Sequence, residues 1–158
     1  MSATSVAADA TGSIEIAASP DDVYRLLTDL DRFASVTEET TTMRWTGGAT
    51  GAAPGASFSG ANRNGWRRWS TASIVTDADA GRRFAFEVTA PAGITVARWQ
   101  YDLEPTATGC RVTESTWDRR PAWFVKPAGM ITGVSDRTSG NAANIEATLT
   151  RLKAALES

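Results

Sequence analysis

The stretch WQYDLEPTATGCRVTE, residues 99–114, decides the fold of this chain because it has the pattern of a β-hairpin with two distinct faces. Large side chains recur at every second position on both arms, which is the period of a strand, and a turn-forming segment at 105–109 separates the arms. One face carries the following residues: Trp99, Tyr101, Leu103, Cys110, Val112 and Glu114. One carboxylate therefore shares a face with apolar side chains, which suggests an internal cavity.

The turn position predicts how the two arms pair. It gives three pairs on the apolar face: Leu103 with Cys110, Tyr101 with Val112, and Trp99 with Glu114. The same register places Asp102 opposite Arg111 on the other face, where opposite charges are mildly stabilising. A slip of one residue would turn every large side chain to the solvent, so we expect the faces to be strongly specified.

Length and charge indicate one globular domain over residues 12–158 after a flexible start at residues 1–11. A chain of 158 residues buries roughly 70% of its unfolded surface, enough for a core that contains a cavity. The chain has 16 basic and 18 acidic residues, so no general attraction to nucleic acid or to an anionic membrane is expected.

The chain has no histidine and a single cysteine, Cys110. This excludes Ser-His and Cys-His catalysis, imidazole metal sites and an internal disulfide, so we expect no metal and no cofactor. Cys110 is interpreted as a small core residue. Residues 1–11 lack the features of a signal peptide, and no apolar window is long enough to cross a bilayer. We therefore expect a cytoplasmic protein with no stable membrane insertion.

A helix is predicted after a short strand that begins near residue 13. Ser19 is a suitable N-cap and Pro20 suits the first helical position. The segment 29–31 could divide this region into two short helices. Its apolar residues follow helical spacing: Val23, Leu26, Leu27, Leu30 and Phe33.

Residues 38–117 show successive strand patterns separated by turn residues, which predicts an antiparallel meander. A period of three and four then replaces the period of two and predicts one long amphipathic helix, carrying Ile131, Val134, Thr138, Ala142, Ile145, Leu149, Leu152 and Leu156. Gly129, Gly133 and Gly140 lie in its first half and weaken it. Our hypothesis is that residues 129–140 gate the cavity.

The dipeptide Asn64-Gly65 between two strand-like runs predicts a two-residue turn that pairs Arg63 with Trp66. Continued outward, this register gives three pairs on the concave face: Asn62 with Arg67, Gly60 with Trp69, and Phe58 with Thr71. The surrounding NRNGWRRWS motif mixes cations with tryptophans, as some nucleic-acid surfaces do. Its charges alternate between two faces, so no nucleic-acid partner is expected.

The order of strand, capped helix, meander and long C-terminal helix resembles the SRPBCC superfamily, and more narrowly its bacterial polyketide cyclase/dehydrase branch. The motifs that carry the resemblance are GASFSGANRNG (55–65), RRWSTASIV (67–75), GRRFAFEV (81–88), WQYDLEPTATGCRVTESTW (99–117) and RLKAAL (151–156). It covers residues 12–157. It implies an α+β helix-grip fold, in which a curved seven-stranded antiparallel sheet wraps a long C-terminal helix around an apolar cavity, with one or two short helices after the first strand. The family includes aromatases, cyclases and lipid carriers.

Glu114 is the foremost candidate site residue because burial beside Trp99 would raise its pKa into a range useful for proton transfer. The structural alternative is an ion pair with Arg67. Tyr101 is either a hydrogen-bond donor to a carbonyl or enolate, or a packing residue. Asp118 is interpreted as a cap or turn residue. The predicted ligand-binding set is Trp45, Phe58, Asn62, Arg67, Trp69, Phe86, Trp99, Val112, Ile145 and Leu149.

Three functions remain open. The favoured one is binding or transport of a small hydrophobic molecule, aromatic, polyketide-like or lipid, in the cavity. The second is a polyketide cyclase, aromatase or dehydratase that uses Glu114 as acid/base, with Tyr101 or Arg67 stabilising developing negative charge. The third is a protein-interaction module whose cavity is filled by side chains. The sequence does not determine the oligomeric state.

Overall fold

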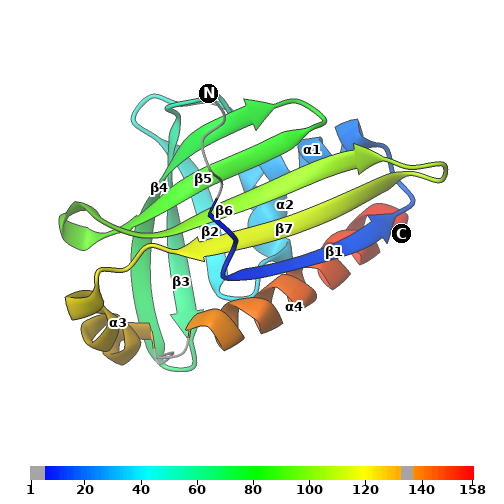
Figure 1. The fold of residues 1–158 in the computed structure, drawn as a ribbon. Helices are drawn as coiled ribbons and strands as arrows, with labels where there is room; N and C mark the ends of the chain where they lie inside the picture. The colour runs from blue at the N-terminus through cyan, green and yellow to red at the C-terminus, as the bar shows by residue number, and fades with distance from the viewer. Residues whose placement is uncertain (1–5, 133–136) are drawn as a thin grey trace.

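The computed structural model describes residues 6–132 and 137–158, which form a seven-stranded antiparallel sheet that curves over a long helix (Figure 1). The strands are β1 (Ala10–Ile16), β2 (Thr40–Thr46), β3 (Ser57–Asn64), β4 (Arg67–Asp79), β5 (Arg83–Ala90), β6 (Ile94–Pro105) and β7 (Cys110–Asp118). The helices are α1 (Pro20–Thr28), α2 (Leu30–Val36), α3 (Val125–Thr132) and α4 (Arg137–Glu157), with short 3₁₀ turns η1 (Pro91–Gly93) and η2 (Ala122–Phe124). The strand order β1-β7-β6-β5-β4-β3-β2 confirms the predicted meander and α+β helix-grip fold.

Helices α1 and α2 are two short helices, as the sequence allowed. Ser19 caps α1, since its Oγ accepts the backbone N–H of Asp22 at 3.1 Å. Asp29 ends α1 and caps α2, because its own N–H donates to the carbonyls of Arg25 and Leu26 while its side chain accepts from Arg32. Both helices bury one apolar face against the sheet.

The predicted pairing of β6 with β7 is wrong by two positions, although every residue keeps its predicted face. Tyr101 pairs with Glu114, Leu103 with Val112, and Pro105 with Cys110. The error arose because β6 continues to Pro105, so that the turn is confined to 106–109, where the N–H of Thr106 donates to the carbonyl of Gly109 at 3.0 Å.

The predicted charge pair between Asp102 and Arg111 is therefore absent. Arg83 on β5 donates to Asp102 at 2.7 Å, and Arg111 donates to Glu15 on β1 at 3.1 Å. Both carboxylates sit on strands next to their arginine, so the outer face is stabilised by different pairs from those predicted.

The hairpin of β3 and β4 is also shifted. Asn64 pairs with Arg67, and the two turn residues are Gly65 and Trp66. Gly65 has a φ of 63°, which places glycine at the first central position, as type II′ turns require. The pairs on the concave face become Asn62 with Trp69, Gly60 with Thr71, and Phe58 with Ser73.

The predicted single C-terminal helix is divided into α3 and α4, whose described parts flank residues 133–136. Gly129 belongs to α3 and Gly140 to α4, whereas Gly133 lies outside the described residues. The gating hypothesis for 129–140 therefore stays a prediction.

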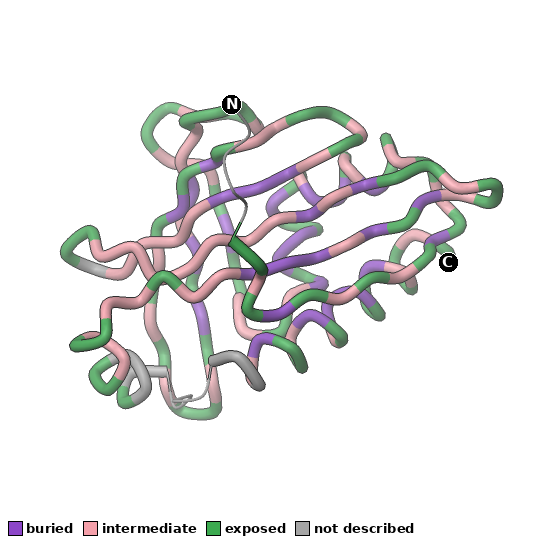
Figure 2. The backbone as a smooth tube through the Cα atoms, in the orientation of Figure 1, coloured by how far each residue is buried: buried purple, intermediate pink, exposed green. Residues whose placement is uncertain are grey.

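Helix α4 packs its apolar face on β1, and the close approach depends on Gly12. Ile145, Leu149 and Leu152 are all buried in the core. Figure 2 shows that buried positions recur along α4 between exposed ones. A Cβ atom on Gly12 would lie 2.8 Å from Cγ2 of Ile145, closer than side chains tolerate. Gly12 also pairs with Glu114, so the helix crosses the sheet beside the candidate site residue.

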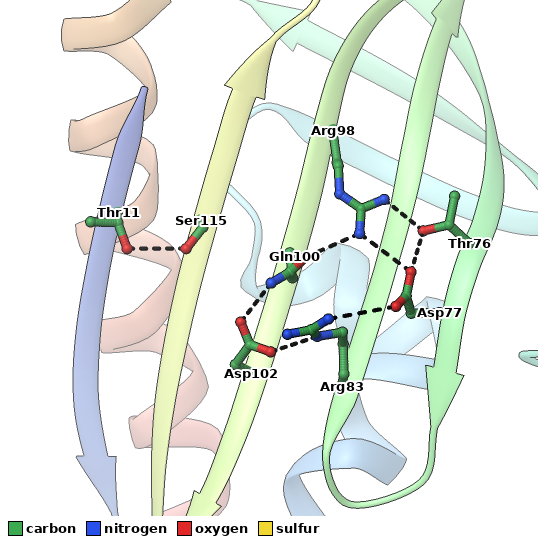
Figure 3. Close-up of polar contacts among 8 residues, drawn as sticks. All are labelled: Thr11, Thr76, Asp77, Arg83, Arg98, Gln100, Asp102 and Ser115. Atoms are coloured by element: carbon green, nitrogen blue, oxygen red, sulfur yellow. Dashed lines mark hydrogen bonds and ion pairs between the residues drawn. The ribbon is translucent and has the colours of Figure 1, made fainter. Parts of the chain in front are cut away.

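A polar network covers the face of the sheet turned away from the helices (Figure 3). Strand β4 contains an irregularity between Val75 and Asp77, and there Arg98 donates to both Thr76 (2.7 Å) and Asp77 (3.3 Å). Arg83 bridges Asp77 to Asp102, which also accepts from Gln100. The network links three neighbouring strands, β4 to β6, through partly exposed charges, of which Arg98 is the most buried.

Replacing Arg98 by methionine is expected to lower the free energy of unfolding by about 1–2 kcal/mol, because its side chain is only 17% exposed and its removal leaves Asp77 with one fewer donor. The matched control is Arg111→Met, whose pair with Glu15 is 52% exposed on each side and should cost below about 0.5 kcal/mol. Urea denaturation measures both. Equal effects would show that the network adds nothing beyond a surface pair.

Candidate functional site

A cavity of about 260 Å³ lies between the concave face of the sheet and helices α2 and α4. Inward positions on β3 to β6 alternate with outward ones, so large apolar side chains gather on the concave face of the sheet and line the cavity. Its apolar wall includes Phe33, Phe58, Trp69, Phe86, Val88 and Trp99. Such a wall suits a small apolar ligand.

Many of the residues predicted for the site do line this cavity. They are Phe58, Asn62, Trp69, Phe86, Trp99, Tyr101 and Glu114. The sequence predicted the inner face of the sheet correctly for all of them, although both predicted hairpin registers were wrong. A shift of two positions changes the cross-strand partner and keeps the face.

The other predicted residues lie elsewhere. Val112, Ile145 and Leu149 are buried in the core and are not among the lining residues, and Trp45 packs edge-on against Phe58 with ring centroids 5.6 Å apart. Their apolar periodicity identified buried positions, but burial alone does not separate a cavity wall from a filled core.

Arg67 does not pair with Glu114, contrary to the structural alternative. Its guanidinium lies 4.5 Å from the centroid of the Trp66 ring, and its Nε donates to the carbonyl of Met130 in α3 at 3.3 Å. The corrected turn places Arg67 first on β4, at the tip of the hairpin, where its side chain is outside the cavity wall.

Glu114 is instead bonded to Tyr101, its neighbour across β6 and β7. The Tyr101 hydroxyl donates to Oε1 of Glu114 at 2.6 Å, and both side chains are 2% exposed. Oε2 of Glu114 is buried with no hydrogen-bond partner in the described structure. This carboxyl therefore has one satisfied oxygen and one buried oxygen without a partner, in a residue that lines the cavity.

Burial raises the pKa of Glu114 to about 8, and the bond from Tyr101 opposes this rise only in part. Burial, followed by the nearby Glu114 carboxyl, raises the pKa of Tyr101 well above its ordinary value. Near pH 7 the pair is consequently neutral, and the protonated carboxyl can donate a hydrogen bond from Oε2. A carboxyl that gains or loses a proton near neutral pH is also suited to acid/base chemistry.

Arg120 and Asp118 line the same cavity, and the sequence reading missed them as a pair. Nε of Arg120 donates to both oxygens of Asp118 at 3.0 and 3.1 Å, and Nη2 donates to Oδ2 at 2.7 Å. The Arg120 side chain is 6% exposed, and its Nη1 is buried without a hydrogen-bond partner. The signal was partial, because the inward period of two on β7 runs from Glu114 to Asp118, and Arg120 is the next position of that period but lies beyond the strand end.

Amides and hydroxyls form the polar part of the wall. Asn62 accepts from the Thr40 hydroxyl at 2.8 Å and donates to the Thr71 hydroxyl at 3.2 Å, while Asn144 on α4 donates to Glu39 at 2.9 Å. These bonds tie β2, β3, β4 and α4 together around the cavity and leave fewer free polar groups facing a ligand.

Within residues 6–132 and 137–158, no three acidic or cysteine side chains converge as a metal site. No helix in the same described part of the chain is both long enough and apolar enough to cross a membrane. The polar groups in the cavity lining are the carboxyls of Glu38, Glu39, Glu114 and Asp118, the Tyr101 phenol, the Arg120 guanidinium, and several amides and hydroxyls.

Comparison with known proteins places these features in context. The family model described as "Polyketide cyclase / dehydrase and lipid transport" matches residues 7–157. The Polyketide_cyc-like protein Cgl2372 from Corynebacterium glutamicum is 30% identical, with a TM-score of 0.61 over 93% of this chain and 90% of that one. No curated protein sequence is significantly similar.

Two more distant structures share the fold. Protein NE0264 from Nitrosomonas europaea is 16% identical, with a TM-score of 0.68 over 96% of this chain and 97% of that one. The di-domain ARO/CYC StfQ from the steffimycin biosynthetic pathway is 15% identical, with a TM-score of 0.71 over 93% of this chain and 49% of that one. At these identities the likeness concerns the fold.

Proposed function

Since the chain belongs to the polyketide cyclase/dehydrase and lipid transport family, we propose that its cavity binds one small, mostly apolar molecule and holds an oxygen of that molecule at Glu114. The observation that carries the proposal is that Oε2 of Glu114, a residue of the cavity lining, is buried without a hydrogen-bond partner. Leaving such a group unpaired costs roughly 1–3 kcal/mol, so a ligand oxygen at this position gains binding energy.

The size of the cavity limits the ligand. At about 260 Å³ it is just below the usual range for drug-sized ligands, which begins at roughly 300 Å³. Phe86 and Trp99 are cross-strand neighbours on β5 and β6, and together they form an aromatic part of the wall that favours a planar or short-chain apolar molecule. A phenol with a short alkyl chain combines both requirements.

A second function, catalysis of cyclisation or dehydration, is favoured by the pKa of about 8 at Glu114. In its ionised form such a carboxyl can take a proton from a carbon next to a carbonyl and return it to a departing hydroxyl. The Tyr101 hydroxyl, which donates to Oε1 of Glu114, would have to turn from that oxygen to donate to a developing oxyanion. Glu114→Gln separates the two functions. The variant should keep its ligand in both cases, and only an enzyme has a turnover rate that the variant would lose.

The binding proposal predicts that 4-hexylphenol changes the tryptophan fluorescence of the protein in a saturable way, because Trp69 and Trp99 line the cavity. Val88→Phe, which adds bulk to the cavity wall, should weaken binding roughly tenfold or more.

The matched control is Ile74→Phe, which adds similar bulk at a 47% exposed position on β4 and should leave the affinity unchanged. A panel of alkylphenols and naphthols that gives no response would contradict the proposal and support the protein-interaction module. Equal weakening by both variants would show that the probe binds outside the cavity.

A further inference from the structure

Two side-chain atoms in the described structure are buried without any hydrogen-bond partner, and both belong to residues of the same cavity wall. One is Oε2 of Glu114, on which the proposed function rests. The other is Nη1 of Arg120, whose side chain is 6% exposed. Most buried polar groups in proteins are paired, so two exceptions in one cavity point to a ligand that supplies the missing partners.

The two atoms belong to residues six positions apart in the chain. Glu114 lies in the middle of β7, and Arg120 follows the end of that strand. Six residues of extended chain separate their Cα atoms by up to about 20 Å. For residues at this separation, two ligand oxygens joined by an apolar segment suit the two groups better than one shared oxygen.

The contacts of Arg120 define what its free nitrogen can bind. Asp118 occupies the Nε and Nη2 side of the guanidinium with three hydrogen bonds. This pairing fixes the plane of the group and compensates much of its charge. Nη1 has only N–H donors, so its partner must be an acceptor oxygen.

We propose that Nη1 of Arg120 binds a second oxygen of the ligand, at the opposite end from the oxygen held by Glu114. This inference rests on the proposed function and narrows it to an elongated molecule with an apolar middle and oxygen functions at both ends. The acceptor at the Arg120 end is a carboxylate or a ketone oxygen, which share the chemistry that a guanidinium N–H recognises.

The test uses three matched probe series with 2 to 8 methylenes between the phenol ring and the end group. The longest probes approach the maximum distance of about 20 Å between the Cα atoms of Glu114 and Arg120. The series are 4-hydroxyphenylalkanoic acids, the corresponding methyl ketones, and 4-alkylphenols of equal length. Affinity is measured by calorimetry for the wild-type protein and for Arg120→Lys and Arg120→Met.

The wild-type protein is expected to bind an acid or ketone of optimal length roughly 10- to 100-fold more tightly than the matched alkylphenol. This preference, taken as the ratio of the two affinities measured on the same variant, should disappear in Arg120→Met. Arg120→Lys keeps a cation for Asp118 but lacks Nη1, so we expect it to lose the ketone preference as well. Alkylphenol binding by each variant also reports that its cavity is folded.

Each outcome has one meaning. A gain with acids alone identifies a carboxylate ligand, and a gain with both series identifies any acceptor oxygen. Equal affinity for all three series in the wild-type protein, or a preference that survives Arg120→Met, overturns the inference and leaves the proposed function intact. Failure of the wild-type protein to bind any alkylphenol overturns the proposed function and this inference together.

Discussion

Glu114→Gln should remove most of the pH dependence of stability between pH 5 and pH 8. The pKa of Glu114 is raised from its ordinary value of 4.5 to about 8 in the folded state. A group whose folded pKa is raised contributes most stability at low pH, and this contribution is lost as the pH rises through the folded pKa. The free energy of unfolding should thus fall by about 3.5 kcal/mol from pH 5 to pH 8.

Glutamine suits this test because it imitates the protonated carboxyl. It keeps an oxygen that accepts from Tyr101 at the position now 2.6 Å from that hydroxyl, and its amide donates where the protonated Oε2 would. The chain has no histidine, so no imidazole titrates in the same window. The variant is expected to match the wild-type protein at pH 5 and to exceed its stability at pH 8.

Urea denaturation at intervals of pH measures this effect, with Glu104→Gln on the exposed part of β6 as the control. The control should reproduce the wild-type slope. If Glu114→Gln leaves the slope unchanged, the carboxyl is ionised in the folded protein at neutral pH, and its proposed role as a hydrogen-bond donor is wrong.

The second large effect is expected at Gly109, in the turn between β6 and β7. A Cβ atom there would overlap the carbonyl oxygen of Ile16 and lie 2.9 Å from the backbone nitrogen of Ala18. Both contacts are with backbone just after β1, which cannot move aside as a flexible side chain does. Gly109→Ala should therefore destabilise the protein by about 3 kcal/mol or more.

Gly51→Ala is the matched control, because a Cβ at that position meets nothing within 4 Å. We expect it to change the free energy of unfolding by less than about 0.5 kcal/mol. Thermal and urea unfolding of both variants provide the comparison. A Gly109→Ala protein within 1 kcal/mol of wild type would contradict the tight approach of this turn to the chain after β1.

The two hairpins show which parts of the fold a sequence can predict. The period of two assigned Trp99, Tyr101 and Glu114 to the inner face correctly, because alternation is a local property of each strand. Register depends on where a turn begins. Pro105 and Asn64 were predicted as turn residues, but both pair within their strands, so each turn begins one residue later than predicted. The predicted cross-strand partners were therefore wrong while the predicted faces were right.

The site shows the same division. Glu114 could be identified because it interrupts an apolar row, but its partner Tyr101 depends on register. Arg120 lies past the strand end, where parity is less certain, and its importance comes from a pairing that leaves one nitrogen free. Ile145 and Leu149 were assigned to the ligand because periodicity indicates burial, whereas they fill the core against β1.

A crystal structure of the protein with 4-hexylphenol would show whether the cavity holds a ligand oxygen at Glu114. We expect the phenol hydroxyl within hydrogen-bond distance of Oε2 of Glu114, with the ring against Phe86 or Trp99 and the alkyl chain extending toward Arg120. A probe bound outside the cavity, or inside it with its hydroxyl away from Glu114, would contradict the proposed function.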